Sequence, residues 1–229
     1  MSPLLQLPAI QQLPETLQGA FAAACTRRKL AHGTVFEAAG MLPLGAHCAL
    51  SGSMRMYSHN SDGERVLVSI LPPNYWFGIA PMCDGGLTMF EVVASGPTEV
   101  LTLPKAAFEE LLATQPAMQR LCLDWLSFKL RAFSNRIANA ATLPLDQLLA
   151  RQMLTLMEGW GKPAGRAVRI DMRLSHEDLA EMVGATRQRI HQIMHTWENQ
   201  GVVGRDGKSI TVLDTSALVR LTGVNHFPH

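Results

Sequence analysis

The sequence has no apolar run long enough to cross a membrane. A membrane-spanning helix needs roughly 20 consecutive apolar residues, and no segment of the 229 residues approaches that length. The N-terminus also lacks the basic start of a secretory signal, and Pro3, Pro8 and Pro14 interrupt its apolar residues. These absences predict a cytoplasmic protein with no membrane partner.

Closely spaced cysteines are missing as well. The four cysteines are scattered without any CxxC pair, at Cys25, Cys48, Cys83 and Cys122. This pattern excludes the usual zinc-finger and thioredoxin spacings, and it is typical of reduced thiols in a cytosol.

A large net charge is the third absence, because 20 Lys and Arg balance 19 Asp and Glu to leave +1. Nucleic-acid-binding proteins usually carry excess positive charge, so any such surface here must arise from local placement. What the chain does have is 47% hydrophobic and 17% charged residues, a composition typical of a globular protein with a buried core. Its length is sufficient for two domains.

Residues 33–103 predict an all-β domain. Glycines recur at the intervals expected of turns, and Asn60-Ser61-Asp62-Gly63 is a tight-turn signal. Between the turns lie four β-rich runs, at residues 49–57, 66–71, 90–94 and 100–103. We therefore expect a β-sandwich or barrel.

Helical patterns follow, with a short segment at residues 105–113 and a long one from Pro116 to about Ala141. The long helix carries two neighbouring apolar stripes. One consists of Met118, Leu121, Trp125, Phe128 and Ala132, and the other of Cys122, Leu126, Leu130, Phe133 and Ile137. We expect one stripe to cover the barrel and the other to form a dimer. A helix buried wholly within one chain is the alternative.

A domain boundary is predicted at Thr142-Leu143-Pro144, because the residue before a proline avoids helical geometry. The next helix spans residues 145–160, and residues 168–173 alternate as a strand would. Glycines and a proline at residues 159–165 close that helix.

Residues 174–203 have the pattern of a helix-turn-helix. Ser175 followed by Asp178 predicts a capping box at the start of the first helix. Gly184 falls where a left-handed turn residue is needed, and Thr186 can cap the second helix.

The second helix has one apolar face and one polar face. Helical spacing turns Ile190, Ile193, Met194 and Trp197 toward the core. The opposite face presents donor-rich side chains: Gln188, Gln192, His195 and Asn199, flanked by Arg189 and His191, with Arg187 in the first turn. Arg pairs bidentately with guanine, and Gln or Asn pairs with adenine. This face therefore predicts a reader of the DNA major groove.

Residues 202–213 predict a two-stranded wing, in which Arg205 and Lys208 are placed to meet phosphates. The predicted DNA-contacting set joins side chains of the second helix, the two helix starts and the wing. It comprises Arg187, Gln188, Arg189, His191, Gln192, Ser175, Thr186 and Lys208.

In its order of barrel, long helix and winged helix-turn-helix, the chain resembles the bacterial Crp/Fnr transcription regulators over residues 17–218. Residues 174–203 carry the resemblance most specifically, and residues 33–40, 50–57, 62–65 and 77–78 resemble the family's β-roll. The implied fold is α+β: a cyclic-nucleotide-binding-like β-roll sensory domain (1–115), a dimerisation helix (116–142) and a winged helix-turn-helix domain (143–229). The resemblance also implies a homodimer on palindromic double-stranded DNA, RNA polymerase as a partner, and a small-molecule effector in the β-roll.

Differences from the family's sequence pattern limit the class of effector that the β-roll is expected to bind. Members that bind cyclic nucleotides carry Gly-Glu and Arg-Ser/Thr, where this chain has Gly78-Ile79 and Leu87-Thr88, without Lys or Arg between Arg65 and Lys105. Burying a phosphate without a cation is costly, so we expect neither cyclic AMP nor cyclic GMP.

Metal-containing cofactors depend on cysteine or histidine ligands. Cys25 alone before the barrel cannot hold the family's iron–sulfur cluster. His32, His47 and His59 are candidate axial ligands, so a haem-dependent gas or redox sensor is the alternative. A small apolar effector, or none, suits the Met, Trp and Phe content better, and the residues identify no particular one.

The second helix of the helix-turn-helix, which is the DNA-recognition helix in this family, also differs from the usual family sequence. Many members have Arg-Glu and then a second Arg, where this chain has Arg187-Gln188 and then Gln192. Losing the acid removes an acceptor for cytosine, while Gln favours adenine. We therefore expect a half-site that differs from the family's usual one.

Two other classes of protein compete with this reading. A metal-dependent enzyme on a β-barrel needs closely spaced histidines with a carboxylate, and His47 and His59 are far apart, so we expect no enzyme. The other is a binding module whose helix-turn-helix no longer contacts DNA, which the donor-rich face disfavours.

Overall fold

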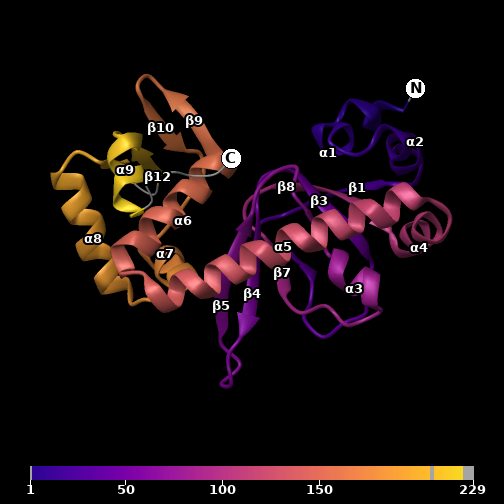
Figure 1. Ribbon diagram of the computed structural model, residues 1–229, viewed down its shortest axis with the longest axis horizontal. Helices are drawn as coiled ribbons and strands as arrows, with labels where there is room; N and C mark the ends of the chain where they lie inside the picture. Colours follow the sequence, from indigo (N-terminus) through magenta and orange to yellow (C-terminus); the bar gives the residue numbers. More distant parts are fainter. Residues whose placement is uncertain (1, 207–208, 224–229) are drawn as a thin grey trace. The chain divides into compact units, whose positions relative to one another are not determined.

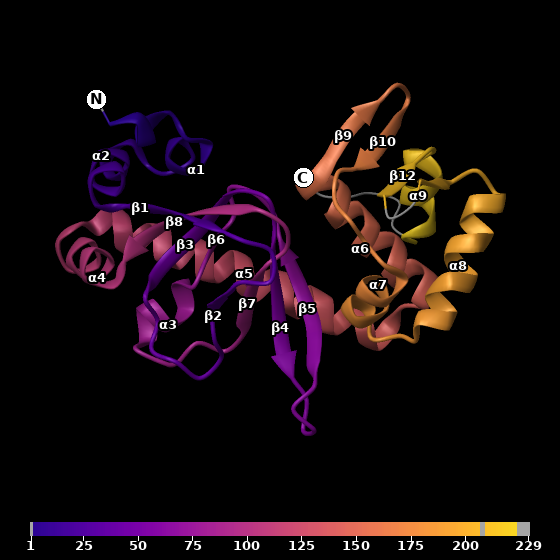
Figure 2. The ribbon, with the colours of Figure 1, turned by 180° about the vertical axis from the view of Figure 1, so that it is seen from behind.

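The computed structural model describes residues 2–206 and 209–223. The chain forms two compact units, residues 1–133 and 134–229, and the long helix α5 (Pro116–Thr142) contributes to both. Figures 1 and 2 show the elements of each unit from two sides.

The first unit begins with three short helices: η1 (Pro3–Gln6), α1 (Pro8–Gln11) and α2 (Glu15–Ala24). Pro3 and Pro8 are the first residues of η1 and α1, and Pro14 is the N-cap of α2. Proline suits the first turn of a helix, where its fixed φ is already helical and its missing N–H has no partner to lose. The prolines that interrupt the apolar run in the sequence therefore start helices.

Two antiparallel four-stranded sheets form the β-roll among the described residues (Figure 2). The first has the order β1-β8-β3-β6, with bounds Thr26–Leu30, Thr98–Pro104, Gly45–Ser51 and Trp76–Phe77. The second has the order β2-β7-β4-β5, with bounds Val35–Glu37, Glu91–Ala94, Met54–His59 and Arg65–Leu71. Buried side chains from both sheets, among them Val100 and Met54, pack in one cluster. The all-β prediction for this region is confirmed.

The predicted single run at residues 49–57 is wrong in one respect, because it divides into β3 and β4. Gly52 makes the turn with φ 74°, a left-handed conformation that favours glycine. A Cβ there would lie 2.5 Å from the carbonyl oxygen of Pro97, so a side chain is excluded as well. The β-rich sequence pattern continues through Gly52, so the pattern alone does not indicate the turn.

Helices cover the outer face of the first sheet. Helices α3 (Ile79–Asp84) and α4 (Lys105–Thr114) follow β6 and β8, and α5 begins directly after α4. Phe21 of α2, Phe108 of α4 and Met118 of α5 pack in one buried cluster with Cys48 of β3 and Leu101 of β8. Strand β3 is buried on both faces because helices lie on one side of it and the second sheet on the other.

The second unit is a winged helix-turn-helix (Figure 1). After the C-terminal part of α5, its elements are α6 (Leu145–Trp160), β9 (Gly161–Ala164), β10 (Ala167–Ile170), α7 (His176–Val183), α8 (Arg187–Asn199), β11 (Val203–Asp206), β12 (Ser209–Val212) and α9 (Thr215–Leu221). Helix α6 packs against α7, α9 and β10. The strands pair in the order β11-β12-β10-β9, so the predicted wing is the edge of a larger sheet.

Strand β9 was not expected from the sequence, which there predicted only the end of a helix. Pro163 has no N–H to donate, and it sits in the outermost strand, where one side needs no hydrogen-bonded partner. Gly165 makes the turn to β10 with φ 67°. A Gly- and Pro-rich segment thus forms an edge hairpin without the β-branched residues that usually mark a strand.

Candidate nucleic-acid interface

The start of α7 is fixed by the predicted capping box. The main-chain N–H of Asp178 donates to Ser175 Oγ at 3.0 Å, and the N–H of Ser175 donates to Asp178 Oδ2 at 2.8 Å. Two N–H groups that the helix itself leaves unpaired are satisfied in this way. Ser175 therefore stabilises the start of α7.

The turn between α7 and α8 also follows the prediction. Gly184 is the C-cap of α7 with φ 68°. Thr186 is the N-cap of α8, where its Oγ1 accepts a hydrogen bond from the N–H of Arg189 at 3.3 Å. These two caps fix where the second helix begins, and so which side chains its first turn presents.

Helix α8 separates its side chains as predicted. Ile190, Met194 and Trp197 are buried, and Ile193 is half-buried. The predicted DNA-reading side chains of this helix are all exposed, and these are Arg187, Gln188, Arg189, His191, Gln192, His195 and Asn199. The exposed face carries hydrogen-bond donors, and the one acidic side chain of α8, Glu198, is half-buried on its flank, so the face suits acceptor groups on a nucleic acid.

Histidines extend along this helix and onto α7. The His176 and His191 rings meet edge to face with centroids 5.3 Å apart, and the His191 and His195 centroids are 6.3 Å apart. Asn199 Nδ2 lies 3.1 Å from His195 Nδ1. Burial lowers the pKa of His176 to about 4, with further lowering by Arg205, His191 and Arg187. His176 is therefore uncharged at neutral pH.

The wing strand places Arg205 differently from the expectation of a phosphate contact. Its guanidinium points into the protein, where Nη2 donates to the carbonyl oxygen of Leu174 at 3.2 Å and Nη1 lies 2.5 Å from His176 Nε2. Sequence periodicity could not show this, because the partner residues are 29 and 31 positions away. Lys208 lies outside the described residues.

Two arginines tie the end of α5 to the helix-turn-helix unit. Arg136 Nη2 donates to the main-chain oxygen of Met182 in the last turn of α7 at 2.7 Å. Arg151 of α6 donates to Asn139 Oδ1 at 2.8 Å and to the carbonyl oxygen of Thr222 at 3.3 Å. No pattern in the sequence indicated these long-range contacts.

The two predicted stripes of α5 are redistributed. Met118 and Cys122 are buried against the β-roll, and Leu121, Trp125 and Leu126 pack partly on the same cluster. Both stripes therefore contribute to the side that faces the roll, Met118 from one and Cys122 from the other, while Phe128 is exposed. Among the described residues, the apolar contacts of α5 with this cluster extend to Leu126, and Lys129 Nζ donates to the hydroxyl of Tyr75 at 2.9 Å.

An exposed apolar seam remains on α5. It consists of the exposed residues Leu123, Leu130, Phe133 and Ile137 together with the half-buried Leu126, and the five alternate three and four residues apart. Leu123 is 61% exposed, Leu130 68% and Ile137 72%. Large apolar side chains at this spacing and exposure are the pattern of a helix that pairs with another helix.

The position equivalent to a cyclic-nucleotide site does not suit a cyclic phosphate. Ile79, where an acid would meet the ribose, is buried in the core, and Leu87, where an arginine would meet the phosphate, is an exposed apolar side chain. The Thr88 hydroxyl donates to the carbonyl oxygen of Ala38 at 2.6 Å and accepts from the N–H of Met41 at 3.0 Å. The Thr88 hydroxyl, which a phosphate would need as a donor, is therefore already hydrogen-bonded to the neighbouring loop.

Of the three candidate haem ligands, His47 is enclosed in the core, where its Nε2 has no hydrogen-bond partner among the described residues, and His32 and His59 have polar neighbours. His47 is 1% exposed, lies 3.0 Å from Thr102 Oγ1 through Nδ1, and lies 3.7 Å from Glu37 Oε1 through Nε2. His32 Nδ1 accepts from the N–H of Gly96 at 2.9 Å, and His59 lies 3.8 Å from Glu91. Within residues 2–206 and 209–223, no group of three or more His, Cys, Asp or Glu side chains is arranged to hold a metal.

All four cysteines are free thiols in or against one hydrophobic cluster of the first unit. Cys25, Cys48 and Cys122 are buried and Cys83 is partly exposed. Burial raises the pKa of Cys25 and of Cys48 to about 12. None of the helices in the described part of the chain is long and apolar enough to span a bilayer.

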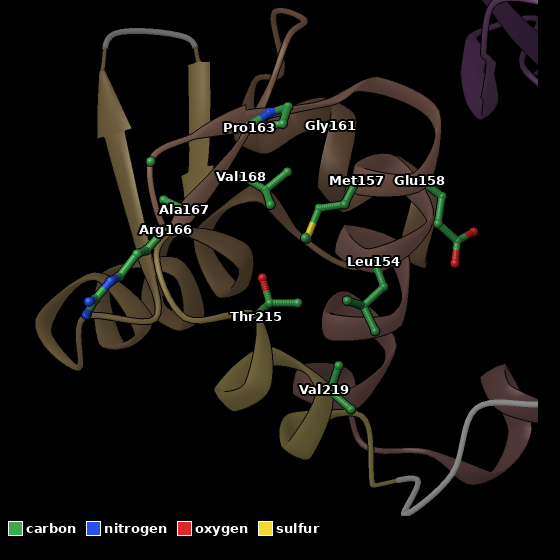
Figure 3. Close-up of a pocket in the computed structure, with 11 residues that line it drawn as sticks. Leu154, Met157, Glu158, Gly161, Pro163, Arg166, Ala167, Val168, Thr215 and Val219 are labelled. Atoms are coloured by element: carbon green, nitrogen blue, oxygen red, sulfur yellow. The ribbon is translucent and has the colours of Figure 1, made fainter.

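A cavity of about 520 Å³ lies in the second unit between α6, the β9–β10 hairpin and α9 (Figure 3). Met157 and Val168 point into it, whereas Glu158 and Arg166 point outward at its two sides. Its lining includes none of the predicted DNA-contacting residues. The cavity is therefore separate from the reading face of α8.

A β-roll, a long helix and a winged helix-turn-helix with a donor-rich second helix define a DNA-binding transcription regulator. Two family models match the chain: the cyclic nucleotide-binding domain over residues 27–115 and the Crp-like helix-turn-helix domain over residues 147–221. The chain belongs to the Crp/Fnr family of bacterial transcription regulators.

Relatives of known function agree with this placement. The CRP-like cAMP-activated global transcriptional regulator of Mycobacterium tuberculosis is 25% identical over 171 residues, which cover 75% of this chain and 76% of the relative. The global nitrogen regulator of Synechocystis is 28% identical over 171 residues, covering 74% and 76%. These relatives are transcription regulators, and none of them is named as an enzyme.

Solved structures share the fold. FixK2 from Bradyrhizobium japonicum matches with a TM-score of 0.77 at 16% identity, covering 88% of this chain and 99% of that one. A CRP/FNR-family transcriptional regulator from Thermus thermophilus matches with a TM-score of 0.71 at 20% identity, covering 88% and 100%. The predicted order of β-roll, long helix and winged helix-turn-helix is confirmed.

Proposed function

We propose that this protein regulates transcription as a homodimer that binds a two-fold-symmetric promoter site. The observation that carries the proposal is the combination of a donor-rich exposed face on α8 with an exposed apolar seam on α5. In a symmetric dimer, the two recognition helices would enter successive major grooves about 34 Å apart. RNA polymerase is the partner through which a promoter-bound regulator acts.

The DNA arm of the proposal rests on the side chains that α8 exposes. Arg187 and Gln188 lie in the first turn, the end of the helix that reaches base edges in this motif. Gln192 follows one turn later on the same side. Ser175 and Thr186, at the two helix starts, are proposed to contact the DNA backbone, as main-chain and hydroxyl groups at helix N-termini commonly do.

The dimer arm rests on the seam. In the chain alone, four of its large apolar side chains are exposed to water, and a second copy of α5 would remove them from it. Alternating spacings of three and four residues keep such a seam aligned along two helices. This support is independent of any property of the DNA-binding unit.

The signal arm of the proposal is an effector other than a cyclic nucleotide. Ile79, Leu87 and the occupied Thr88 hydroxyl offer no charged or free polar partner to a cyclic phosphate. An effector shifts a regulator only if it binds the DNA-competent state more tightly than the other state. We therefore expect cyclic AMP to leave DNA affinity unchanged.

The haem-dependent sensor is the weaker candidate. His47 is 1% exposed, so iron could reach its ring only if the core opened, and His32 Nδ1 already accepts a hydrogen bond from the N–H of Gly96. An absorption spectrum of the freshly purified protein separates the two candidates, because bound haem gives an intense visible band.

The decisive experiment combines oligomeric state with DNA binding. Leu130→Asp places a charge in the seam, while Ser127→Asp places the same charge on another exposed position of α5. Light scattering is expected to give a dimer for wild type and Ser127→Asp, and a monomer for Leu130→Asp. Gel shifts with genomic fragments should show the monomer binding a palindrome more weakly. A wild-type monomer that binds DNA fully would overturn the dimer arm.

A further inference from the structure

Arg205 connects the wing to the first helix of the helix-turn-helix. It lies on β11, and its two terminal nitrogens contact the carbonyl oxygen of Leu174 and Nε2 of His176, at 3.2 and 2.5 Å. Leu174 and His176 lie on either side of Ser175, the N-cap of α7. The guanidinium therefore contacts α7 on both sides of the residue at which the helix begins.

The contact continues from α7 to the recognition helix. The His176 ring meets His191 of α8 edge to face, with centroids 5.3 Å apart and planes at 76°. Arg205, His176 and His191 thus form one continuous set of contacts from β11 through α7 to α8. His191 is exposed and belongs to the predicted DNA-contacting set.

We propose that Arg205 is a positioning residue for DNA binding, which ties the wing to the start of α7 and, through His176, sets the orientation of His191 on α8. The proposal rests on the proposed function of α8 as the reader of DNA. It gives Arg205 a protein partner in place of the phosphate contact that its place in the wing would suggest.

The chemistry of the pair suits this role. A guanidinium presents several N–H donors in a fixed fork, so one side chain can hold two acceptors at once, whereas a lysine ammonium is a single point charge. Because burial and the neighbouring cations lower the pKa of His176 to about 4, its Nε2 is free to accept at neutral pH. The imidazole hydrogen must then be on Nδ1.

A positioning residue and a phosphate contact differ in salt dependence. Removing one phosphate contact lowers the slope of log affinity against log salt by about 0.9 and weakens binding to every DNA sequence. Removing a positioning residue weakens binding to the preferred sequence and leaves the slope unchanged, because the number of phosphates neutralised stays the same.

The test measures fluorescence anisotropy with two duplexes over a range of KCl concentrations. One duplex is selected with the wild-type protein and the other is random. Arg205→Ala and His176→Phe are expected to lose roughly tenfold in affinity for the selected duplex, with wild-type slopes and wild-type affinity for the random one. Arg205→Lys should restore little, because its three donors radiate from a single nitrogen and lack the fixed fork that reaches both acceptors.

The matched control is Arg220→Ala, which removes the same charge from α9, where Arg220 lies 3.9 Å from Asp214. It should bind both duplexes like wild type. A slope lowered by about 0.9 in Arg205→Ala, with His176→Phe unaffected, would make Arg205 a phosphate contact and overturn the proposal. Full rescue by Arg205→Lys would overturn it too, because a point charge would then suffice.

A spectroscopic measurement distinguishes a failure of the proposed DNA-binding function from a failure of the positioning role of Arg205. Nitrogen-15 spectra of the imidazoles should show His176 as the Nδ1–H tautomer in wild type, and this signature should be lost in Arg205→Ala. If wild type binds neither duplex while the signature is present, the proposed function fails and the contact stands. If wild type binds DNA and the signature is absent, the positioning role alone fails.

Discussion

Arg136 of α5 donates a hydrogen bond to the main-chain oxygen of Met182, in the last turn of α7, over 2.7 Å. Carbonyl groups at the end of a helix have no partner within it, so a cation there satisfies an open acceptor and also complements the helix dipole. Arg151 holds the same stretch of α5 through Asn139. The C-terminal part of the long helix is thereby fixed to the helix-turn-helix unit.

Replacing Arg136 with Ala should destabilise this unit by about 2 kcal/mol, the usual cost of losing a hydrogen bond that involves a charged group. Urea unfolding of the full-length protein, followed by circular dichroism, measures the change. Arg131→Ala is the control, since Arg131 is an exposed arginine of the same helix. Equal midpoints for the two variants would show that the contact with Met182 contributes nothing to stability.

The four thiols should differ in reactivity. A hydrogen bond with the Cys122 thiol lowers the pKa of Cys83, against the opposing effects of burial and Asp84, and the same bond raises the pKa of Cys122. Cys25 and Cys48 have pKa values raised to about 12 by burial. Because the thiolate is the nucleophile, iodoacetamide at pH 8 should label Cys83 first.

Mass spectrometry of the labelled peptides checks this order. In urea all four thiols should react at similar rates, and Cys83→Ser should remove the fast phase from the native protein. Labelling that began at Cys122 or Cys48 would contradict the assignment.

The sequence was most informative where structure is set by neighbouring residues. The capping box, the turn glycine and the apolar face of α8 involve residues within a few positions of one another, so periodicity and composition define them. The long helix α5 was predicted with an end only one residue from the observed Thr142. Its two faces were less well predicted, because which turns touch the roll depends on tertiary packing.

Contacts between distant residues could not be predicted. The sequence predicts that Arg205 contacts phosphates from the wing, and only the folded chain brings it to His176. The N-terminal helices and strand β9 were missed because proline and glycine are read as interruptions, although proline also starts helices and occupies edge strands. In each case, tertiary placement decided between two roles that one residue type can have.

His176 should make stability depend on pH in one direction. Its pKa falls from 6.5 to about 4 on folding, so between these values the unfolded chain binds a proton that the folded protein does not. The contribution of His176 is therefore fully present above pH 6.5 and is lost as pH falls toward 4. Unfolding free energies at pH 7, 6 and 5 should show the wild-type advantage over His176→Phe shrinking with falling pH. A constant difference would contradict the lowered pKa.

Gln188 and Gln192 should shift the preferred half-site away from the family's usual sequence. Neither side chain repeats the acid or the second arginine of that pattern, and Gln favours adenine. Binding-site selection with Gln188→Glu should restore a preference for cytosine at one position, worth about 1–3 kcal/mol. Gln200→Glu, at the other end of α8, adds the same charge and should leave the selected sequence unchanged. Wild-type selection of the ordinary family palindrome would refute the shift.

Arg187 and Lys208 should differ in what they contribute to DNA affinity. Arg187 is exposed in the first turn of α8, so Arg187→Ala should cost about 1–3 kcal/mol on the selected site and relax one base position. Lys208→Ala should instead weaken all sequences alike and lower the salt slope by about 0.9, the signature of one phosphate contact. Titrations of both variants against selected and random duplexes, at several salt concentrations, separate the two effects. Unchanged selectivity in Arg187→Ala would mean that α8 presents a different set of side chains to the bases.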